Sequence, residues 1–389
     1  MSADDSATLR KVAIACQGGG SHTAFTAGVL KRLLQEHGSS HRIAALSGTS
    51  GGALCAFVTW YKLRTRGPHQ ASAALDELWE RVATSNPFEG IANAGVVLNA
   101  QLYDMGFPMW QTSPALNPVA AMGQDWLRRT ITSFIDDTPL QELIIEPDAV
   151  PDPPLPPKLL ISAVDANDGS FDVFSDRPEL ERPADGGSAE NRLLREMSER
   201  LREESQPISV DAILASTAVP PLFDTVSLPA SNDPSHAYWD GLLSQNPPVR
   251  NLLAGPEGKD QKPDEIWLIR INPTHQNGDF DSLEVIANRR NELAGNISLE
   301  QELYFIRKVN RWLNEGKFTE DMREQYKRVP VRQIQLDEGE LDPPRQLRTA
   351  SKIDRDHDFI TDLKGLGYRE ADSFLRDVEA HTIVSATPS

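Results

Sequence analysis

The sequence predicts an α/β fold in which helices flank a parallel-rich central sheet, followed by a helical C-terminal extension. Residues 11–63 follow the order strand, loop, helix, strand, turn, helix. Such alternation is typical of βαβ units and favours a parallel sheet. Two later runs, 158–164 (KLLISAV) and 266–271 (IWLIRI), are apolar almost throughout, as strands covered on both faces are. Beyond residue 280 the pattern is mainly helical and charged.

The first unit can be assigned element by element. Residues 11–16 (KVAIAC) predict a short buried strand, which the run Gln17–Gly20 ends. Residues 24–36 have the apolar spacing of a helix, and residues 43–46 predict a second short strand. After a turn, residues 53–63 are apolar on nearly every side, which predicts a buried helix.

The middle of the chain is mostly helical from residue 64 to 150. Within it, the apolar segment Met105–Trp110 is interrupted by Gly and Pro. A lid or substrate-facing loop is one interpretation, and a covered core loop is the favoured one. Pro151–Pro157 (PDPPLPP) predicts a stiff connector, and residues 177–206 predict a surface loop followed by a helix.

The remaining elements follow from the same patterns. Residues 171–174 predict a strand that continues the sheet, and residues 210–218 predict a helix stopped by two prolines. In the last third, residues 281–316 predict a long charged helix, residues 329–336 a strand, and residues 351–378 a further helix.

The bulk composition is that of a globular protein with an acidic surface. The chain has 389 residues, 39% of them hydrophobic, and a formal net charge of −18. This length allows one large domain, or a large domain with a smaller companion. The negative charge disfavours binding to nucleic acid and gives no general attraction to anionic bilayers.

No targeting or membrane-spanning signal is found. The first ten residues, MSADDSATLR, lack the basic start and apolar core of a signal peptide, and no apolar run approaches the roughly 20 residues that span a bilayer. We expect a cytosolic protein, which must visit the membrane surface if it acts on lipid. Cys16 and Cys55 are expected to be buried free thiols and not a disulfide or metal pair.

The motif Gly48-Thr49-Ser50-Gly51-Gly52 has the G-x-S-x-G pattern of a nucleophile elbow. An apolar strand precedes it and an apolar helix follows it, so the serine hydroxyl would project from a sharp turn at a helix N-terminus. This context predicts a nucleophilic serine. The alternative is a tight structural turn that contains a serine by chance.

The glycine run Gln17-Gly18-Gly19-Gly20 follows the first predicted strand in the same way. Consecutive glycines allow successive backbone N–H groups to point at one place, as an oxyanion hole requires. A phosphate or dinucleotide loop is the rival interpretation, but the chain has neither G-x-G-x-x-G nor G-x-x-x-x-G-K-[ST] at this position. Because both glycine turns follow strands of adjacent units, we expect them at the same sheet edge.

A serine nucleophile needs a proton acceptor. The four histidines in polar loops or surface segments are each most simply solvated side chains: His236, His275, His357 and His381. An aspartate is the better candidate, because Tyr238-Trp239-Asp240-Gly241-Leu242 places an acid at the end of a short aromatic strand. A plain β-turn is the alternative for Asp240-Gly241.

Taken together, these residues resemble the patatin-like phospholipases, a family of lipid acyl hydrolases. The similarity lies in the glycine loop Gly18–Gly20, the elbow Gly48–Gly52, the acid motif Asp240–Leu242 and the stretch Ala215–Phe223 (ASTAVPPLF), within residues 11–250. The resemblance implies a three-layer α/β/α fold, a Ser50–Asp240 dyad without histidine, and hydrolysis of lipid esters through an acyl-enzyme. Ser21-His22-Thr23 and Leu242 depart from the usual family pattern.

The resemblance also predicts the domain organisation. Residues 11–250 would form the catalytic domain, and residues 251–389 a strand-plus-helical extension packed on it. Residues 288–301 (NRRNELAGNISLEQ) resemble an extension found on a bacterial subset of the family. We expect a lipid ester as the substrate, transient contact with the membrane surface, and no metal or other cofactor.

Two other classes of function remain open at this stage. One is a Ser-Asp-His esterase of the α/β-hydrolase type, although Ser50 comes earlier in the chain than that fold normally places its nucleophile. The other is a non-catalytic module that binds lipid or another ligand.

Overall fold

The structure is a computed structural model that describes residues 9–107, 113–145, 155–178, 205–228, 236–253, 259–276, 279–341 and 345–386. Three of the predictions above fall partly or wholly outside the described residues. These are the end of the Met105–Trp110 segment, most of the Pro151–Pro157 connector, and most of the helix expected within residues 177–206. The described end of that last segment, Ser205 and Gln206, belongs to a strand and not to a helix.

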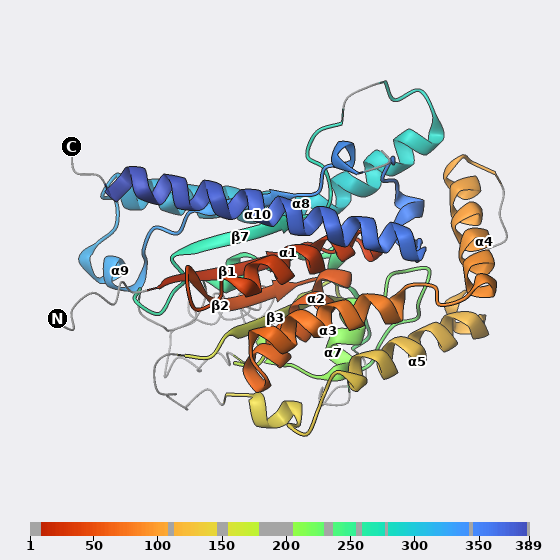
Figure 1. The fold of residues 1–389 in the computed structure, drawn as a ribbon, viewed down its shortest axis with the longest axis horizontal. Helices are drawn as coiled ribbons and strands as arrows, with labels where there is room; N and C mark the ends of the chain where they lie inside the picture. The colour runs from red at the N-terminus through yellow and green to blue at the C-terminus, as the bar shows by residue number, and fades with distance from the viewer. Residues whose placement is uncertain are drawn as a thin grey trace, which may run out of the picture.

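Within the described residues, eight strands form one mixed sheet in the order β5-β4-β3-β2-β1-β7-β8, with β6 paired to β3 (Figure 1). β6 and β4 run antiparallel to β3, and the other neighbouring pairs are parallel. The strands are β1 (Arg10–Cys16), β2 (His41–Gly48), β3 (Lys158–Asp165), β4 (Phe171–Ser175), β5 (Ser205–Pro207), β6 (Tyr238–Asp240), β7 (Glu265–Arg270) and β8 (Val331–Gln335).

Helices cover both faces of this sheet, and long helices dominate the C-terminal region, so the predicted fold class is confirmed (Figure 1). One prediction is wrong in detail: Ser47 and Gly48 continue β2, so the turn before the next helix is tighter than expected. The α-helices are α1 (Ala24–Gln35), α2 (Gly51–Thr65), α3 (Pro68–Val82), α4 (Pro87–Asp104), α5 (Pro118–Ser133), α7 (Val210–Ser216), α8 (Leu283–Asn314), α9 (Glu320–Gln325) and α10 (His357–Ala386).

Alternate residues of the central strands enter two separate cores. On β1, Val12 and Ile14 pack into the larger core with α1, α2, α3 and α10, while Ala13 and Ala15 face the smaller core beneath α8. This is the two-residue period of a strand that is buried on both faces. The apolar runs in the sequence therefore reflect a sheet enclosed between two helical layers.

The C-terminal region contributes to the sheet itself. β7 pairs in parallel with β1, and β8 pairs in parallel with β7, so residues 251–389 extend the sheet beyond the first strand of the chain. The loop after β1 consequently lies where the strand order changes direction, between β2 and β7. Open α/β sheets bind ligands at such a switch point.

Two glycines allow α10 to lie directly on α1. A Cβ on Gly28 of α1 would overlap the backbone of Lys364, and a Cβ on Gly367 of α10 would overlap the carbonyl group of Phe25. Side chains at these two positions would force the helix axes apart. In Figure 1 the two helices run side by side over the front of the sheet.

We predict that Gly367→Ala lowers the free energy of unfolding by about 1–3 kcal/mol, because the new methyl group overlaps backbone that cannot move independently. The measurement is urea unfolding followed by circular dichroism. Gly365→Ala is the matched control, since its Cβ would meet only the Arg369 guanidinium at 3.6 Å. That control should be neutral or slightly stabilising because alanine favours helix. Equal effects at the two positions would contradict the close helix contact.

Candidate active site

Ser50 occupies a strained turn between β2 and α2. Its φ of 56° and ψ of −129° make it the one residue other than glycine with a positive φ among the described residues. Its amide donates to Ser216 Oγ over 3.1 Å, and the side chain of the preceding Thr49 bonds Ser162 Oγ and the Gln245 carbonyl. These contacts hold the unfavourable backbone conformation in place, as is typical of strain at functional sites.

The loop after β1 lies against this elbow. A Cβ on Gly18 would be 2.7 Å from the Thr49 carbonyl oxygen and 3.0 Å from Ser50 Cβ. From the elbow, in turn, a Cβ on Gly51 would overlap the hydroxyl group of Thr23, which follows the glycine loop. The two turns therefore approach each other as closely as backbone allows, and the glycine residues are what permit it.

Asp240 reaches the same place from the other part of the sheet. It ends β6, which pairs with β3 so that Asp240 lies opposite Ala163, and its amide donates to the Ala218 carbonyl over 3.0 Å. The carboxylate is fully buried, and its Oδ1 accepts the Leu242 amide at 2.8 Å. Residues 50 and 240, distant in the sequence, thus become neighbours.

The ionisation of Asp240 is set by its burial. Loss of solvent raises the pKa of Asp240 to about 7, while the Ser50 hydroxyl and the Leu242 amide act in the opposite direction. The hydroxyl is close enough to influence this pKa, yet Oδ2 of Asp240 has no hydrogen-bond partner of ordinary geometry. We conclude that the serine and the carboxylate are adjacent but not aligned in a hydrogen bond.

The amides of the glycine loop differ in what they bind. The Gly18 amide donates to Asn246 Oδ1 over 2.7 Å, so this predicted oxyanion donor already has a partner. No such bond is found for the amides of Gly19, Gly20 and Gly51 within the described part of the chain. Gly20 has a φ of 56°, which turns the chain into the short helix η1 (Gly20–Thr23) beside the elbow.

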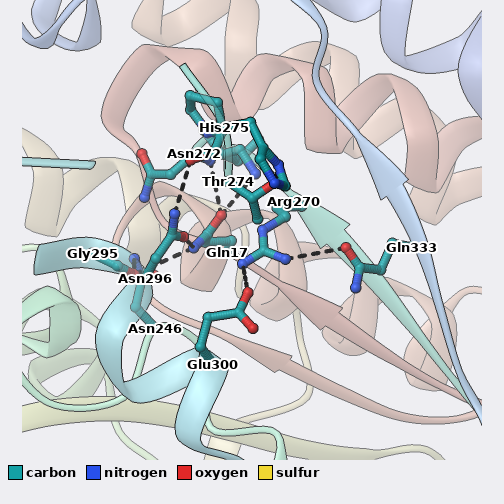
Figure 2. A network of polar contacts seen from close by, with 12 residues as sticks. Gln17, Asn246, Arg270, Asn272, Thr274, His275, Gly295, Asn296, Glu300 and Gln333 are labelled. Carbon is teal, nitrogen blue, oxygen red and sulfur yellow. Dashed lines mark hydrogen bonds and ion pairs between the residues drawn. The ribbon is translucent and has the colours of Figure 1, made fainter. Parts of the chain in front are cut away.

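A network of neutral side-chain amides fixes the β1 loop to α8 (Figure 2). Gln17 Oε1 accepts the amides of Ile271 and Asn272, each at 2.9 Å, and its Nε2 donates to Asn296 Oδ1 at 2.9 Å. Asn246 bridges the same two parts, because it accepts from Gly18 and donates to the Gly295 carbonyl over 3.1 Å. The C-terminal helix α8 therefore supports the loop that faces Ser50.

These four residues, Gln17, Asn246, Gly295 and Asn296, are part of the site without having been predicted as such from the sequence. An indication was present in α8, where polar residues are buried and apolar residues are exposed, the reverse of the usual pattern of a surface helix. The polar residues Asn288, Glu292 and Asn296 are buried at a spacing of four, while Leu293 and Ile297 beside them are 48% and 58% exposed. Polar side chains at helical spacing next to exposed apolar ones indicate a polar interface inside the protein.

The histidines have other partners. His236 pairs with the buried Asp165 and is therefore not simply solvated. His275 and His357 are exposed, as expected, and each contacts only the residue next to it among the contacts given for the described part of the chain. His22 is buried, its Nε2 lies 2.8 Å from Ser351 Oγ, and burial lowers its pKa to about 3. The side chain of His381 lies outside the described residues.

The family model of the patatin-like phospholipases matches residues 14–253, which is more than half of the chain. The chain belongs to the patatin-like phospholipase family. No curated protein sequence matches it. Among solved structures, the crystal structure of VipD from Legionella pneumophila aligns at 11% identity with a TM-score of 0.34, over 92% of this chain and 67% of VipD.

The family match ends at residue 253, before β7, whereas the sheet and the amide network continue into α8. We therefore propose that residues 11–250 carry the catalytic groups and that residues 251–389 complete the scaffold of this patatin-like protein. Both cysteines are free and buried, as expected. No described helix is long and apolar enough to cross a membrane.

We predict that Asn246→Ala lowers kcat for ester hydrolysis on the order of 10- to 100-fold with little change in KM, because the glycine loop loses its link to α8. Steady-state kinetics measure this effect. Asn288→Ala is the matched control, since Asn288 is also buried but binds Thr349 and Glu292 and not the glycine loop. Equal loss of kcat in both variants would indicate a general loss of stability instead of a positioning role.

We predict a pH-dependent gain of stability in Asp240→Asn. The native pKa of about 7 lies above the unfolded value of about 3.9, so the wild-type protein loses stability as pH rises from about 4 to about 7. Between about pH 5 and pH 8 this amounts to roughly 2–3 kcal/mol, which the asparagine variant should not lose. Urea unfolding at both pH values measures the difference, and parallel behaviour of the two proteins would contradict the raised pKa.

Proposed function

We propose that this protein is a serine acyl hydrolase that cleaves lipid esters through a Ser50–Asp240 dyad. The family is shown, whereas the dyad is our inference from the site. The observation that carries it is the pairing of a serine in a strained elbow with a fully buried carboxylate whose pKa is raised to about 7. A carboxylate in water is too weak a base for this task, and desolvation moves its pKa towards the working pH.

The proposed reaction begins when Asp240 accepts the hydroxyl proton of Ser50. Ser50 Oγ then attacks the ester carbonyl carbon, and the C–O bond to the alcohol breaks as Asp240 returns the proton to the leaving oxygen. Water, activated by the same carboxylate, hydrolyses the acyl-enzyme. The free Oδ2 of Asp240 supports this sequence, because it leaves one oxygen available for the proton.

The oxyanion would be held by the free amides beside Ser50. Gly19, Gly20 and Gly51 are the proposed donors, and the Gly18 amide serves to hold the loop through Asn246. The amide after the nucleophile belongs to such sites in other elbow enzymes, and Gly51 is that residue here. Each donor of this kind contributes on the order of 3 kcal/mol to the transition state.

A Ser-Asp-His arrangement receives less support. Of the histidines whose side chains are described, His22 is engaged with Ser351, and His236 with Asp165. Burial also lowers the pKa of His22 to about 3, which makes it a weak proton acceptor. The site offers an aspartate where such an enzyme would use a histidine.

We predict that Ser50→Ala and Asp240→Asn each lower kcat by at least about 10³-fold while the fold is retained. In the wild type, kcat/KM should fall as pH decreases through about 7, because protonated Asp240 cannot accept a proton. A water-soluble short-chain nitrophenyl ester is the assay, and a fluorophosphonate probe should label Ser50. Undiminished hydrolysis by either variant would refute the dyad.

A further inference from the structure

Exposed apolar side chains gather on α4 and the segments next to it. On α4, Phe88 is 86%, Ile91 72% and Leu98 55% exposed, and their spacing puts them on one face of the helix. Tyr103 in the last turn of α4 is also exposed, and the neighbouring segments add further apolar side chains that are 39% or more exposed: Met105, Phe107, Leu116, Val119, Met122 and Trp126. The expectation that Met105 and Phe107 belong to a covered core loop is therefore wrong.

α4 contacts the rest of the protein through a polar residue, whereas an ordinary surface helix makes this contact through its apolar side. Among its described side chains Asn93 alone is buried, and it bonds Asp354 Oδ1 at 2.6 Å and the Arg355 amide at 2.9 Å. A helix in water normally buries its apolar stripe and exposes its polar one. An apolar surface of this extent on a soluble chain indicates an interaction site.

The charges around this surface limit what can bind it. Between Arg81 and Arg128 there is no Lys, Arg or His, and the acidic residues in that interval are Glu89, Asp104 and Asp125. From outside this interval Arg355 adds a single positive charge, because its guanidinium carbon lies 6.0 Å from the centre of the Trp126 ring. Surfaces that bind anionic lipid need clusters of basic residues, which this region lacks. The chemistry fits an apolar partner without net negative charge.

The surface is connected to the glycine loop through the segment that contains the short helix η7 (Thr349–Ile353). α4 bonds the chain just after η7, and the carbonyl of Lys352 in η7 touches Gly20 of the glycine loop. At its other end, Gly106 lies against Leu283, the first residue of α8. Figure 1 shows α4 next to one end of α5 at the edge of the molecule, away from the chain termini.

We propose that the apolar face of α4, with the adjoining start of α5, docks on the surface of a lipid aggregate of zero net charge, such as a zwitterionic bilayer. The lipid surface would cover the exposed Phe88, Ile91 and Leu98 side chains and present ester groups beside Ser50. This proposal rests on the lipid hydrolase function above, which supplies the reason for a lipid partner. The proposed contact is peripheral, because the exposed apolar residues lie on one face of a surface helix.

The test uses the Ser50→Ala protein, so that binding is measured without turnover. It should sediment with phosphatidylcholine vesicles, and Ile91→Asp/Leu98→Asp in the same background should weaken this binding by about tenfold or more. Vesicles of phosphatidylglycerol should bind less well, because the chain carries a charge of −18. Tyr304→Asp is the matched control: Tyr304 is 63% exposed and lies about 30 Å along α8 from Leu283.

The same double variant, with Ser50 restored, separates this proposal from the hydrolase itself. It should hydrolyse a soluble short-chain ester normally and lose activity only on vesicles. Unchanged vesicle binding by Ile91→Asp/Leu98→Asp would overturn the docking surface, whatever the ester assay shows. A wild-type dimer in sedimentation equilibrium that this variant dissociates would also overturn it, because a second copy would then cover the face.

Discussion

The direct contact between two backbone turns is the constraint on which the site depends. β1 and β2 are adjacent and parallel, so the turns that follow them leave the same sheet edge side by side. They meet so closely that a Cβ on Gly18 would be 3.0 Å from Ser50 Cβ. A side chain at position 18 would collide with the elbow, so this close approach needs glycine, and the strain at Ser50 persists because the surrounding hydrogen bonds hold it.

The groups that hold these turns are neutral, and this has a consequence for Asp240. Gln17, Asn246 and Asn296 satisfy buried backbone groups through their amide side chains, without bringing a formal charge to the site. The influences on the pKa of Asp240 are burial, the Ser50 hydroxyl and a backbone amide, and they include no cation. A lysine or arginine in the network would favour the ionised carboxylate and lower this pKa, at the expense of its strength as a base.

Two helices, α4 and α8, depart from the usual distribution of polar and apolar residues, and both departures lie near the site. α8 buries Asn288, Glu292 and Asn296 because it faces a polar interface formed by the β1 loop and by the segments that contain Pro273 and Thr349. α4 buries Asn93 and leaves its apolar residues outside. The buried polar side of α8 supports the glycine loop, and the exposed apolar side of α4 provides an apolar surface near that loop.

The order of strands and helices and the strand-turn-helix context of Ser50 could be predicted from the sequence, because they depend on local periodicity and on glycine at sharp turns. Asp240 became a candidate through the family resemblance, since an Asp-Gly pair by itself indicates no more than a turn. Only the tertiary structure shows which of the backbone amides expected to bind the oxyanion already has a partner. The Gly18 amide donates to the side chain of Asn246, which lies 228 positions away along the chain. The tertiary structure also decided that β7 and α8 complete the site. Contacts between distant segments leave no periodic trace in a single sequence, since they arise only when the chain has packed into one sheet.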